Sequence, residues 1–319
     1  MSDDAPDAPP VWTFAFGSNM NIPLLRTKKL LTVLEHAPAV ARGWRLNFSA
    51  PALAYVEPSF ADAQRGSAED CIHGVAVLLP AESYARLARQ EASYADPETL
   101  VTTYAGRVLT ARIFSRPASQ PGAPDIPCSA RYLDVLVRGA REAGLQPAYV
   151  AALAALPTYA PSAETLARRA ALLPPPRALA AVTVAELRER WADAPRGSAQ
   201  PSDALARTAV LGYVLELPRS AIAFGAHRGR DTSARALRQF RGQPLDEGDD
   251  LGAAAAFPAL AAALPPEREF VAGWLDHYLS KGARVVGYLA EFLAASPPPP
   301  GASEGAGAGA GSALLQGAP

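Results

Sequence analysis

The stretch FAFGSNM, residues 14–20, decides how the first half of the chain folds. Large aromatic residues alternate with smaller ones from Trp12 to Phe16, which is the two-residue period of a strand with one large apolar face. Gly17 ends this pattern, and Pro23 lies near the start of a run with helical spacing. The sequence therefore predicts a strand and a helix that are joined by a tight turn.

The turn carries polar groups at its tip. Gly17 lets the backbone turn without a Cβ clash, while Ser18 and Asn19 bring a hydroxyl and an amide. Free N–H groups at the start of a helix favour an anion or a developing oxyanion. Two interpretations are open from the turn alone: a binding loop, or a Gly-Ser turn that serves geometry only.

Composition excludes several classes of function. The chain has 319 residues, 49% of them hydrophobic, and 30 basic residues balance 31 acidic ones, so nothing favours a nucleic-acid or membrane partner. No apolar stretch is long enough to span a bilayer. Two cysteines make no disulfide framework, and four scattered histidines show no metal-ligand spacing. We expect a cytoplasmic protein without a metal or cofactor.

Composition also divides the chain. Residues 1–10 are acidic and Pro-rich and are expected to be a disordered leader. A domain is predicted over 11–157. Residues 158–295, which begin rich in Ala, Pro and Arg, are expected to form a partly helical extension of unknown role. Residues 296–319 carry Pro and then Gly/Ala/Ser repeats, which are typical of a flexible tail.

The predicted elements of the first half alternate between strands and helices. Strands are expected over 40–48, 71–79, 99–104 and 108–114, the last two forming a hairpin around Gly106. Helices are expected over 22–34 and 81–91, and a third from the N-cap Ser129. In the second half we expect a helix over 183–191, a strand over 208–217 and a long helix over 267–292.

Glu91 is the candidate general acid or base. Tyr84, Leu87, Ala88 and Glu91 lie at i, i+3, i+4 and i+7, so the glutamate falls at the foot of an apolar helical stripe. Burial and the C-terminal end of the helix dipole would both raise the pKa of a carboxyl there, as acid–base work near neutral pH requires. The alternative is a helix that ends earlier and leaves Glu91 in solvent.

These motifs together resemble the gamma-glutamylcyclotransferase family. Residues 14–20 resemble its Tyr-Gly-Ser-Asn loop, and His73-Gly74-Val75-Ala76 is similar to its central strand. Residues 87–91 resemble its short helix that ends in a catalytic glutamate, and residues 127–145 its closing helix. The motifs occur in the family's order over about residues 11–156.

The resemblance implies an α+β fold, a small mixed β-barrel flanked by helices. It implies release of 5-oxoproline from a γ-glutamyl substrate, with Glu91 moving the proton and no cofactor. The substrate-binding residues implied are those of the loop, Phe16, Gly17, Ser18, Asn19 and Met20, together with Phe114.

The sequence departs from the family at three positions. Phe16 and Phe114 stand where the family has tyrosines, so two hydroxyls are missing, and Ala92 replaces a frequent glycine. Tyr94 and Tyr104 line the cavity or belong to the core.

A second hypothesis therefore stays open beside the enzyme. In it, a non-catalytic protein reuses the barrel to bind a ligand or partner. A homodimer fits either hypothesis.

The second half has one further polar motif, His227-Arg228-Gly229-Arg230-Asp231. Its arginines could take a phosphate or carboxylate. They could equally form a solvated loop that is balanced by the acidic residues after it.

Overall fold

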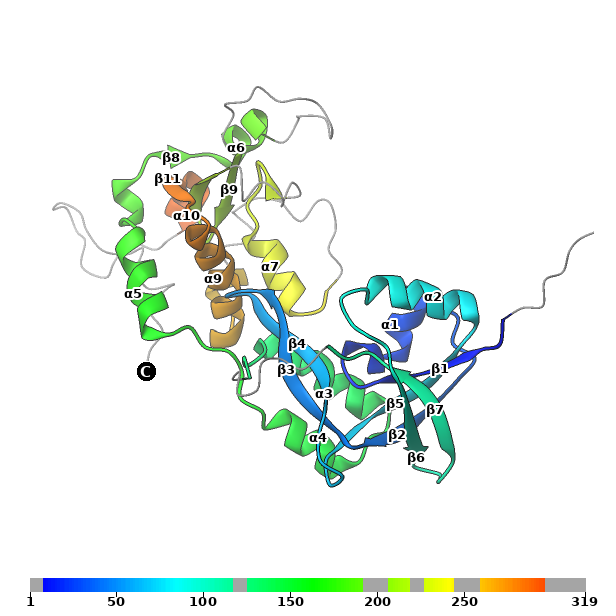
Figure 1. Cartoon of the computed structure of the whole chain (residues 1–319). Helices are drawn as coiled ribbons and strands as arrows, with labels where there is room; N and C mark the ends of the chain where they lie inside the picture. The colour runs from blue at the N-terminus through cyan, green and yellow to red at the C-terminus, as the bar shows by residue number, and fades with distance from the viewer. Residues whose placement is uncertain (1–7, 117–124, 192–205, 219–226, 244–258, 296–319) are drawn as a thin grey trace, which may run out of the picture. The chain divides into compact units, whose positions relative to one another are not determined.

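The computed structural model describes residues 8–116, 125–191, 206–218, 227–243 and 259–295. It divides into two compact units (Figure 1). The first unit comprises Met1–Leu53 and Glu57–Tyr159, and the second comprises Ala54–Val56 and Ala160–Pro319. Most of the expected leader and the whole expected tail lie outside the described residues. Within the described residues, no helix is both long enough and apolar enough to cross a membrane.

The first unit is built on a closed barrel, as predicted, with strand order β1-β5-β2-β6-β7. Neighbouring strands are antiparallel except for β1 and β7, whose parallel pairing closes the barrel. Closure leaves no sheet edge to cover. The strands are β1 (Val11–Ala15), β2 (Glu35–Arg42), β5 (Cys71–Leu79), β6 (Glu98–Thr103) and β7 (Val108–Ile113).

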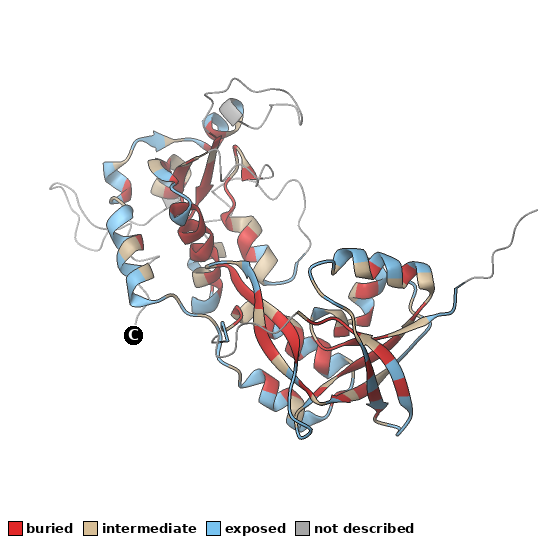
Figure 2. Ribbon diagram, viewed as in Figure 1, coloured by how far each residue is buried: buried red, intermediate tan, exposed pale blue. Residues whose placement is uncertain are grey.

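A separate two-stranded sheet and several helices complete this unit (Figure 1). β3 (Trp44–Leu53) pairs with β4 (Glu57–Arg65), and nearly every residue of β4 is buried (Figure 2). The helical elements are η1 (Ser18–Met20), α1 (Ile22–Thr27), α2 (Ala81–Gln90), α3 (Ala130–Glu142) and α4 (Pro147–Ala154). Ser129 caps α3 as predicted, because its hydroxyl accepts a hydrogen bond from the backbone N–H of Tyr132 at 3.0 Å.

Two boundaries in the first unit differ from the prediction. The helix expected over 22–34 ends at Thr27, and Leu30 adopts a left-handed φ of 54° that breaks the helix. The strand expected over 40–48 is two strands, because Gly43 turns the chain at a φ of 72°. Residues 57–65, for which no element was predicted, form β4.

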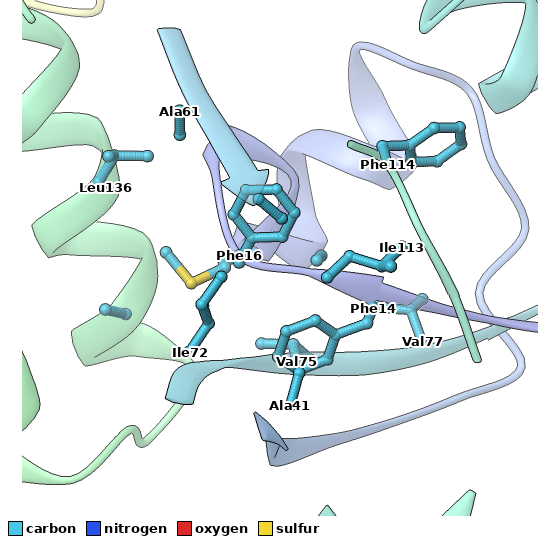
Figure 3. Close-up of a cluster of buried hydrophobic side chains, with 14 of the residues drawn as sticks. Phe14, Phe16, Ala41, Ala61, Ile72, Val75, Val77, Ile113, Phe114 and Leu136 are labelled. Atoms are coloured by element: carbon cyan, nitrogen blue, oxygen red, sulfur yellow. The ribbon is translucent and has the colours of Figure 1, made fainter. Parts of the chain in front are cut away.

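The core of the first unit is centred on the aromatic face of β1. Phe14 and Phe16 are buried, with ring centroids 6.4 Å apart, and Figure 3 shows them among aliphatic side chains such as Val75 and Ile113. Gly74 on β5 leaves room for this face. A Cβ at position 74 would lie 2.8 Å from the ring of Phe14, closer than carbon atoms pack.

The described strands of the second unit form a four-stranded sheet of order β8-β11-β10-β9. The sheet strands are β8 (Ala181–Val182), β9 (Ala206–Val210), β10 (Tyr213–Leu217) and β11 (Arg284–Leu289). The helices are α5 (Ala163–Leu172), η2 (Pro176–Ala178), α6 (Val184–Trp191), α7 (Ser233–Phe240), α9 (Pro265–Ser280) and α10 (Ala290–Ala295). The helix expected over 183–191 is α6, and Thr183 caps it, since its Oγ1 accepts a hydrogen bond from the N–H of Glu186 at 3.1 Å.

The second unit contains more sheet than the sequence predicted. The strand expected over 208–217 is a hairpin, whose turn residues Leu211 and Gly212 have φ values of 52° and 82°. The prediction of one long helix over 267–292 was wrong. This segment forms α9, β11 and α10, because Gly282 at a φ of 84° ends the helix and the following residues pair with β10.

Helix α9 is buried along most of its length (Figure 2). Two of its carboxylates form a charged network with Arg169 of α5. Arg169, only 3% exposed, donates from Nε and Nη2 to the carboxylate of Asp276 at 3.0 and 2.5 Å. Its Nη2 also donates to Glu269 at 2.6 Å. Buried charges are tolerated when they are paired in this way.

Candidate active site

The loop predicted to bind substrate begins where β1 ends. Gly17 is followed by the single turn η1, against which α3 packs. The φ of Gly17, −108°, does not require glycine, but its surroundings favour it. A Cβ at this position would lie 3.3 Å from the hydroxyl of Tyr132 and 3.5 Å from the Cβ of Ala61. The glycine therefore brings the loop backbone close to Tyr132.

Asn19 connects this loop to Glu91. Its Nδ2 donates to Oε1 of Glu91 at 3.1 Å. Its Oδ1 is buried and accepts no hydrogen bond within the described residues. The backbone N–H groups of Gly17, Ser18 and Asn19 likewise donate no hydrogen bond to the described part of the chain. The loop thus offers one acceptor and several donors that the rest of the unit leaves unused.

Glu91 lies just beyond α2 and caps it. Its backbone N–H donates to the carbonyl of Leu87 at 3.0 Å. Because its side chain is 20% exposed and paired, the glutamate is neither buried on the apolar stripe nor free in solvent. Its carboxylate forms an ion pair with Lys29, whose Nζ lies 2.7 Å from Oε1. The two side chains are 27% and 20% exposed, so a ligand from solvent can reach the pair.

Tyr94 adjoins Glu91 and also feels the charge of Asp62. The backbone N–H of Tyr94 donates to the carbonyl of Glu91 at 2.8 Å. Burial, followed by the charges of Glu91 and Asp62, raises the pKa of Tyr94 to about 12. Asp62 is fully buried and accepts from the hydroxyl of Ser49 at 2.8 Å and from the N–H of Arg116 at 2.9 Å.

Tyr132 places a buried hydroxyl at the loop. The hydroxyl oxygen accepts from the N–H of Ala61 at 3.3 Å, and Phe60 packs edge-on against the ring at 4.9 Å. Burial raises the pKa of Tyr132, so its hydroxyl stays protonated at neutral pH. Its own proton has no acceptor among the described residues, which leaves a donor beside Gly17.

The other predicted site residues differ in their surroundings. Ser18 is exposed, while the side chains of Phe16, Met20 and Phe114 belong to the hydrophobic core. In Figure 3 the ring of Phe114 points away from Phe16, and it stacks on Tyr84 with centroids 6.4 Å apart. Any contact of these core residues with a ligand would come mainly from their backbone.

Tyr104 lies in a different cluster. Its hydroxyl is 2.6 Å from Nδ1 of His73, whose ring stacks on Tyr149 at 4.6 Å. Of the two tyrosines that the sequence offered as cavity residues, only Tyr94 adjoins Glu91.

Sequence reasoning missed three residues of this arrangement: Lys29, Asp62 and Tyr132. Lys29 falls within the helix predicted over 22–34, which ends before it at Thr27, and Tyr132 falls within the helix predicted from Ser129. Asp62 stood in a stretch for which no element was predicted. A tyrosine within an otherwise aliphatic face was a signal for Tyr132, since a buried hydroxyl usually needs a partner. The described residues contain no group of three or more His, Cys, Asp or Glu arranged to hold a metal ion.

Comparison with known proteins finds one family model and several solved structures that are similar to part of this chain. Residues 72–153 match the sequence model of the AIG2-like family. No curated protein matches the chain. Similar solved structures include one named gamma-glutamyl cyclotransferase, at 20% identity over 48% of this chain and 91% of that one, with a TM-score of 0.42. An uncharacterized protein from Homo sapiens, loc79017, gives 21% identity over 49% and 92%, also with a TM-score of 0.42.

A third similar structure is a glutathione-specific gamma-glutamyl cyclotransferase from yeast. It has 15% identity over 46% of this chain and 95% of its own, with a TM-score of 0.32. The AIG2-like match lies within the first unit and includes β5, α2, Glu91 and α3. With the closed barrel, this match agrees with the predicted resemblance: residues 72–153 of the first unit are similar to the AIG2-like family.

Proposed function

We propose that the first unit releases 5-oxoproline from a γ-glutamyl amino acid or γ-glutamyl amine. One observation carries this proposal: Asn19 of the loop donates directly to the carboxylate of Glu91. The loop and the glutamate come from distant parts of the sequence, and each was expected to act on the same substrate. Their direct contact supports a single site.

In the proposed reaction Glu91 first accepts a proton from the α-ammonium of the substrate. The freed amine nitrogen then attacks the γ-carbonyl carbon, which forms the ring C–N bond and a tetrahedral oxyanion. As the oxyanion collapses, the bond to the leaving amine breaks and Glu91 returns a proton to that amine. The ring nitrogen passes its remaining extra proton to the released amine, which departs as an ammonium ion. One carboxylate thus acts first as base and then as acid. Because the nucleophile belongs to the substrate, holding it bent supplies much of the rate.

The oxyanion would be stabilised by donors that the protein leaves unused. The backbone N–H groups of Gly17 and Ser18 and the hydroxyl of Tyr132 are such donors. Fixed donors in a partly buried site lower the barrier because they need no reorganisation as charge develops. Tyr94 and Tyr132 also offer hydroxyls beside a site in which Phe16 and Phe114 lack them.

The test is incubation of the purified chain with a panel of γ-glutamyl dipeptides and γ-glutamyl amines, followed by mass-spectrometric detection of 5-oxoproline. Glu91→Gln should lower turnover by about 100- to 10,000-fold, the usual contribution of general acid–base catalysis. Glu82→Gln is the matched control, because Glu82 is an exposed glutamate on the same helix. Turnover that survives in Glu91→Gln would remove this residue from the mechanism, and no 5-oxoproline from any substrate would refute the activity.

A non-catalytic ligand-binding role is the second candidate, and the contact of Lys29 with Glu91 favours it. A carboxylate already neutralised by a lysine suits a binding site as well as a catalytic one. The same experiment separates the two functions. Saturable binding of a γ-glutamyl dipeptide without release of 5-oxoproline is the result expected of a binding module.

A further inference from the structure

The ion pair between Lys29 and Glu91 joins the proposed general base to a cation. The proposed chemistry assigns no task to this lysine. Lys29 follows α1 and reaches Glu91 with its ammonium, and within the described residues Glu91 is the only partner of its side chain. The contact therefore connects two elements of the site and raises the question of what Lys29 binds when a substrate arrives.

The hydrogen bonds at this pair are distributed unevenly. Oε1 of Glu91 accepts hydrogen bonds from both Nζ of Lys29 and Nδ2 of Asn19, whereas Oε2 accepts no hydrogen bond from the described part of the chain. Oδ1 of Asn19 is buried and also lacks a donor there. A buried acceptor without a donor is unfavourable, so the group can accommodate one more cationic donor.

The arrangement is complementary to an α-amino-acid head group. In such a head group the ammonium nitrogen and the nearer carboxylate oxygen lie roughly 3 Å apart, as the covalent geometry at Cα dictates. The protein presents the opposite charges, Nζ of Lys29 and Oε1 of Glu91, 2.7 Å apart. A head group laid antiparallel to this pair would meet a charge of opposite sign at each end.

We propose that Lys29 is the specificity residue for the α-carboxylate of the substrate, an inference that rests on the proposed function. The carboxylate draws Lys29 from Glu91, and the substrate α-ammonium takes its place on the glutamate, with Oδ1 of Asn19 as a further acceptor. One ion pair within the protein is thereby exchanged for two with the ligand. The substrate class is γ-glutamyl compounds whose glutamyl α-carboxylate is free.

The exchange is energetically accessible because the pair is partly exposed. A surface ion pair contributes little to stability, so breaking it for a ligand of matching charge is not prohibitive. A substrate analogue that has an α-carboxamide in place of the carboxylate leaves Lys29 on Glu91. Such an analogue is expected to lose turnover as well as binding, because its amine then competes with Lys29 for the base.

The experiment compares γ-L-glutamyl-L-alanine with its analogue that carries a carboxamide at the glutamyl α-carbon. kcat and KM are measured from the release of alanine. The natural chain should prefer the carboxylate substrate in kcat/KM by roughly 10- to 150-fold, the factor that corresponds to one hydrogen bond between charged groups. Lys29→Met should reduce this preference to near unity, and Lys29→Arg should retain most of it.

Lys28→Met is the matched control, because Lys28 is an exposed neighbour without a contact to Glu91. It should keep the full preference. Thermal melting of each variant checks that the unit is folded. A Lys29→Met variant that is folded and active but keeps the preference of the natural chain would overturn the proposal, and so would a natural chain without any preference.

A binding measurement separates this inference from the proposed activity. 5-Oxo-L-proline retains the carboxylate, whereas 5-oxo-L-prolinamide does not, and their affinities can be measured by NMR titration without turnover. If neither substrate reacts but 5-oxoproline binds more tightly than its amide in a Lys29-dependent way, the carboxylate site stands and the proposed activity fails. If the substrates react but Lys29→Met binds both compounds like the natural chain, the proposal for Lys29 is refuted.

Discussion

The second unit should lose stability as the pH falls below neutrality, and His227 is the main reason. This residue is 8% exposed, its Nδ1 lies 2.6 Å from the hydroxyl of Tyr278, and its ring packs edge-on against Trp274 at 5.1 Å. Burial, with the charges of Arg235 and Arg230, lowers the pKa of His227 to about 4. The perturbation we consider is removal of this titration by His227→Asn.

The sign and size follow from linkage between protonation and folding. Because the folded pKa is lower than the unfolded value near 6.5, the unfolded chain takes up a proton between pH 6.5 and 4 that the folded chain does not. The contribution of His227 is therefore present above pH 6.5 and is lost as the pH falls toward 4. With these two pKa values the free energy of unfolding drops by about 2 kcal/mol from pH 7 to pH 5.

The assay is urea denaturation at pH 7 and at pH 5. Unfolding of the second unit is monitored through the ¹⁹F resonance of 5-fluorotryptophan at Trp274. The loss between the two pH values should be smaller in His227→Asn than in the natural chain by about 2 kcal/mol. Burial also lowers the pKa of His277, so part of the loss should remain in the variant. His36→Asn, at an exposed position, is the control. An unchanged loss in His227→Asn would refute the reasoning.

Three other substitutions test the packing. Asp276→Ala leaves the buried Arg169 without its bidentate partner. The free energy of unfolding of the second unit should fall by about 3–5 kcal/mol, reduced by the contact of Arg169 with Glu269 that remains. An effect below about 1 kcal/mol in urea denaturation would contradict this. Gly74→Ala forces a methyl group against β1 and should cost about 1–3 kcal/mol, measured as a lower Tm. Tyr132→Phe removes the acceptor for a buried backbone N–H, so we expect a loss of about 1–3 kcal/mol in stability together with a lower kcat.

The barrel was predictable because its strands carry strong local signals. Residues 71–79 are almost uniformly apolar, and β5 is indeed buried over most of its length. The failures fall where one residue redirects the chain. Gly43, Gly212 and Gly282 have left-handed φ values, and each divides an element that hydrophobic periodicity had joined. A glycine within a periodic segment is compatible with continuation, so its conformation is decided by the pairing of distant strands.

The site was predictable only as two separate halves. The loop at residues 16–20 and Glu91 carry motifs, but no local pattern indicated that Lys29 would reach the glutamate. That contact depends on α1 ending at Thr27, whereas the helix was predicted to continue to residue 34. Asp62 and Tyr132 were hidden for a similar reason. Tyr132 adjoins Gly17 and the charge of Asp62 acts on Tyr94 because of tertiary packing, which sequence spacing does not encode.

The two ion pairs described here illustrate why exposure separates structure from function in this chain. Arg169 and Asp276 are 3% and 1% exposed, so no ligand can replace either partner without leaving a charge buried and unpaired. The side chains of Lys29 and Glu91 are 27% and 20% exposed. An ion pair at the surface contributes about 0–1 kcal/mol to stability. The first pair is therefore fixed as part of the fold, whereas the second can be opened by a zwitterion that supplies both charges at once. A lysine on the proposed base is then compatible with catalysis, because the substrate itself removes it.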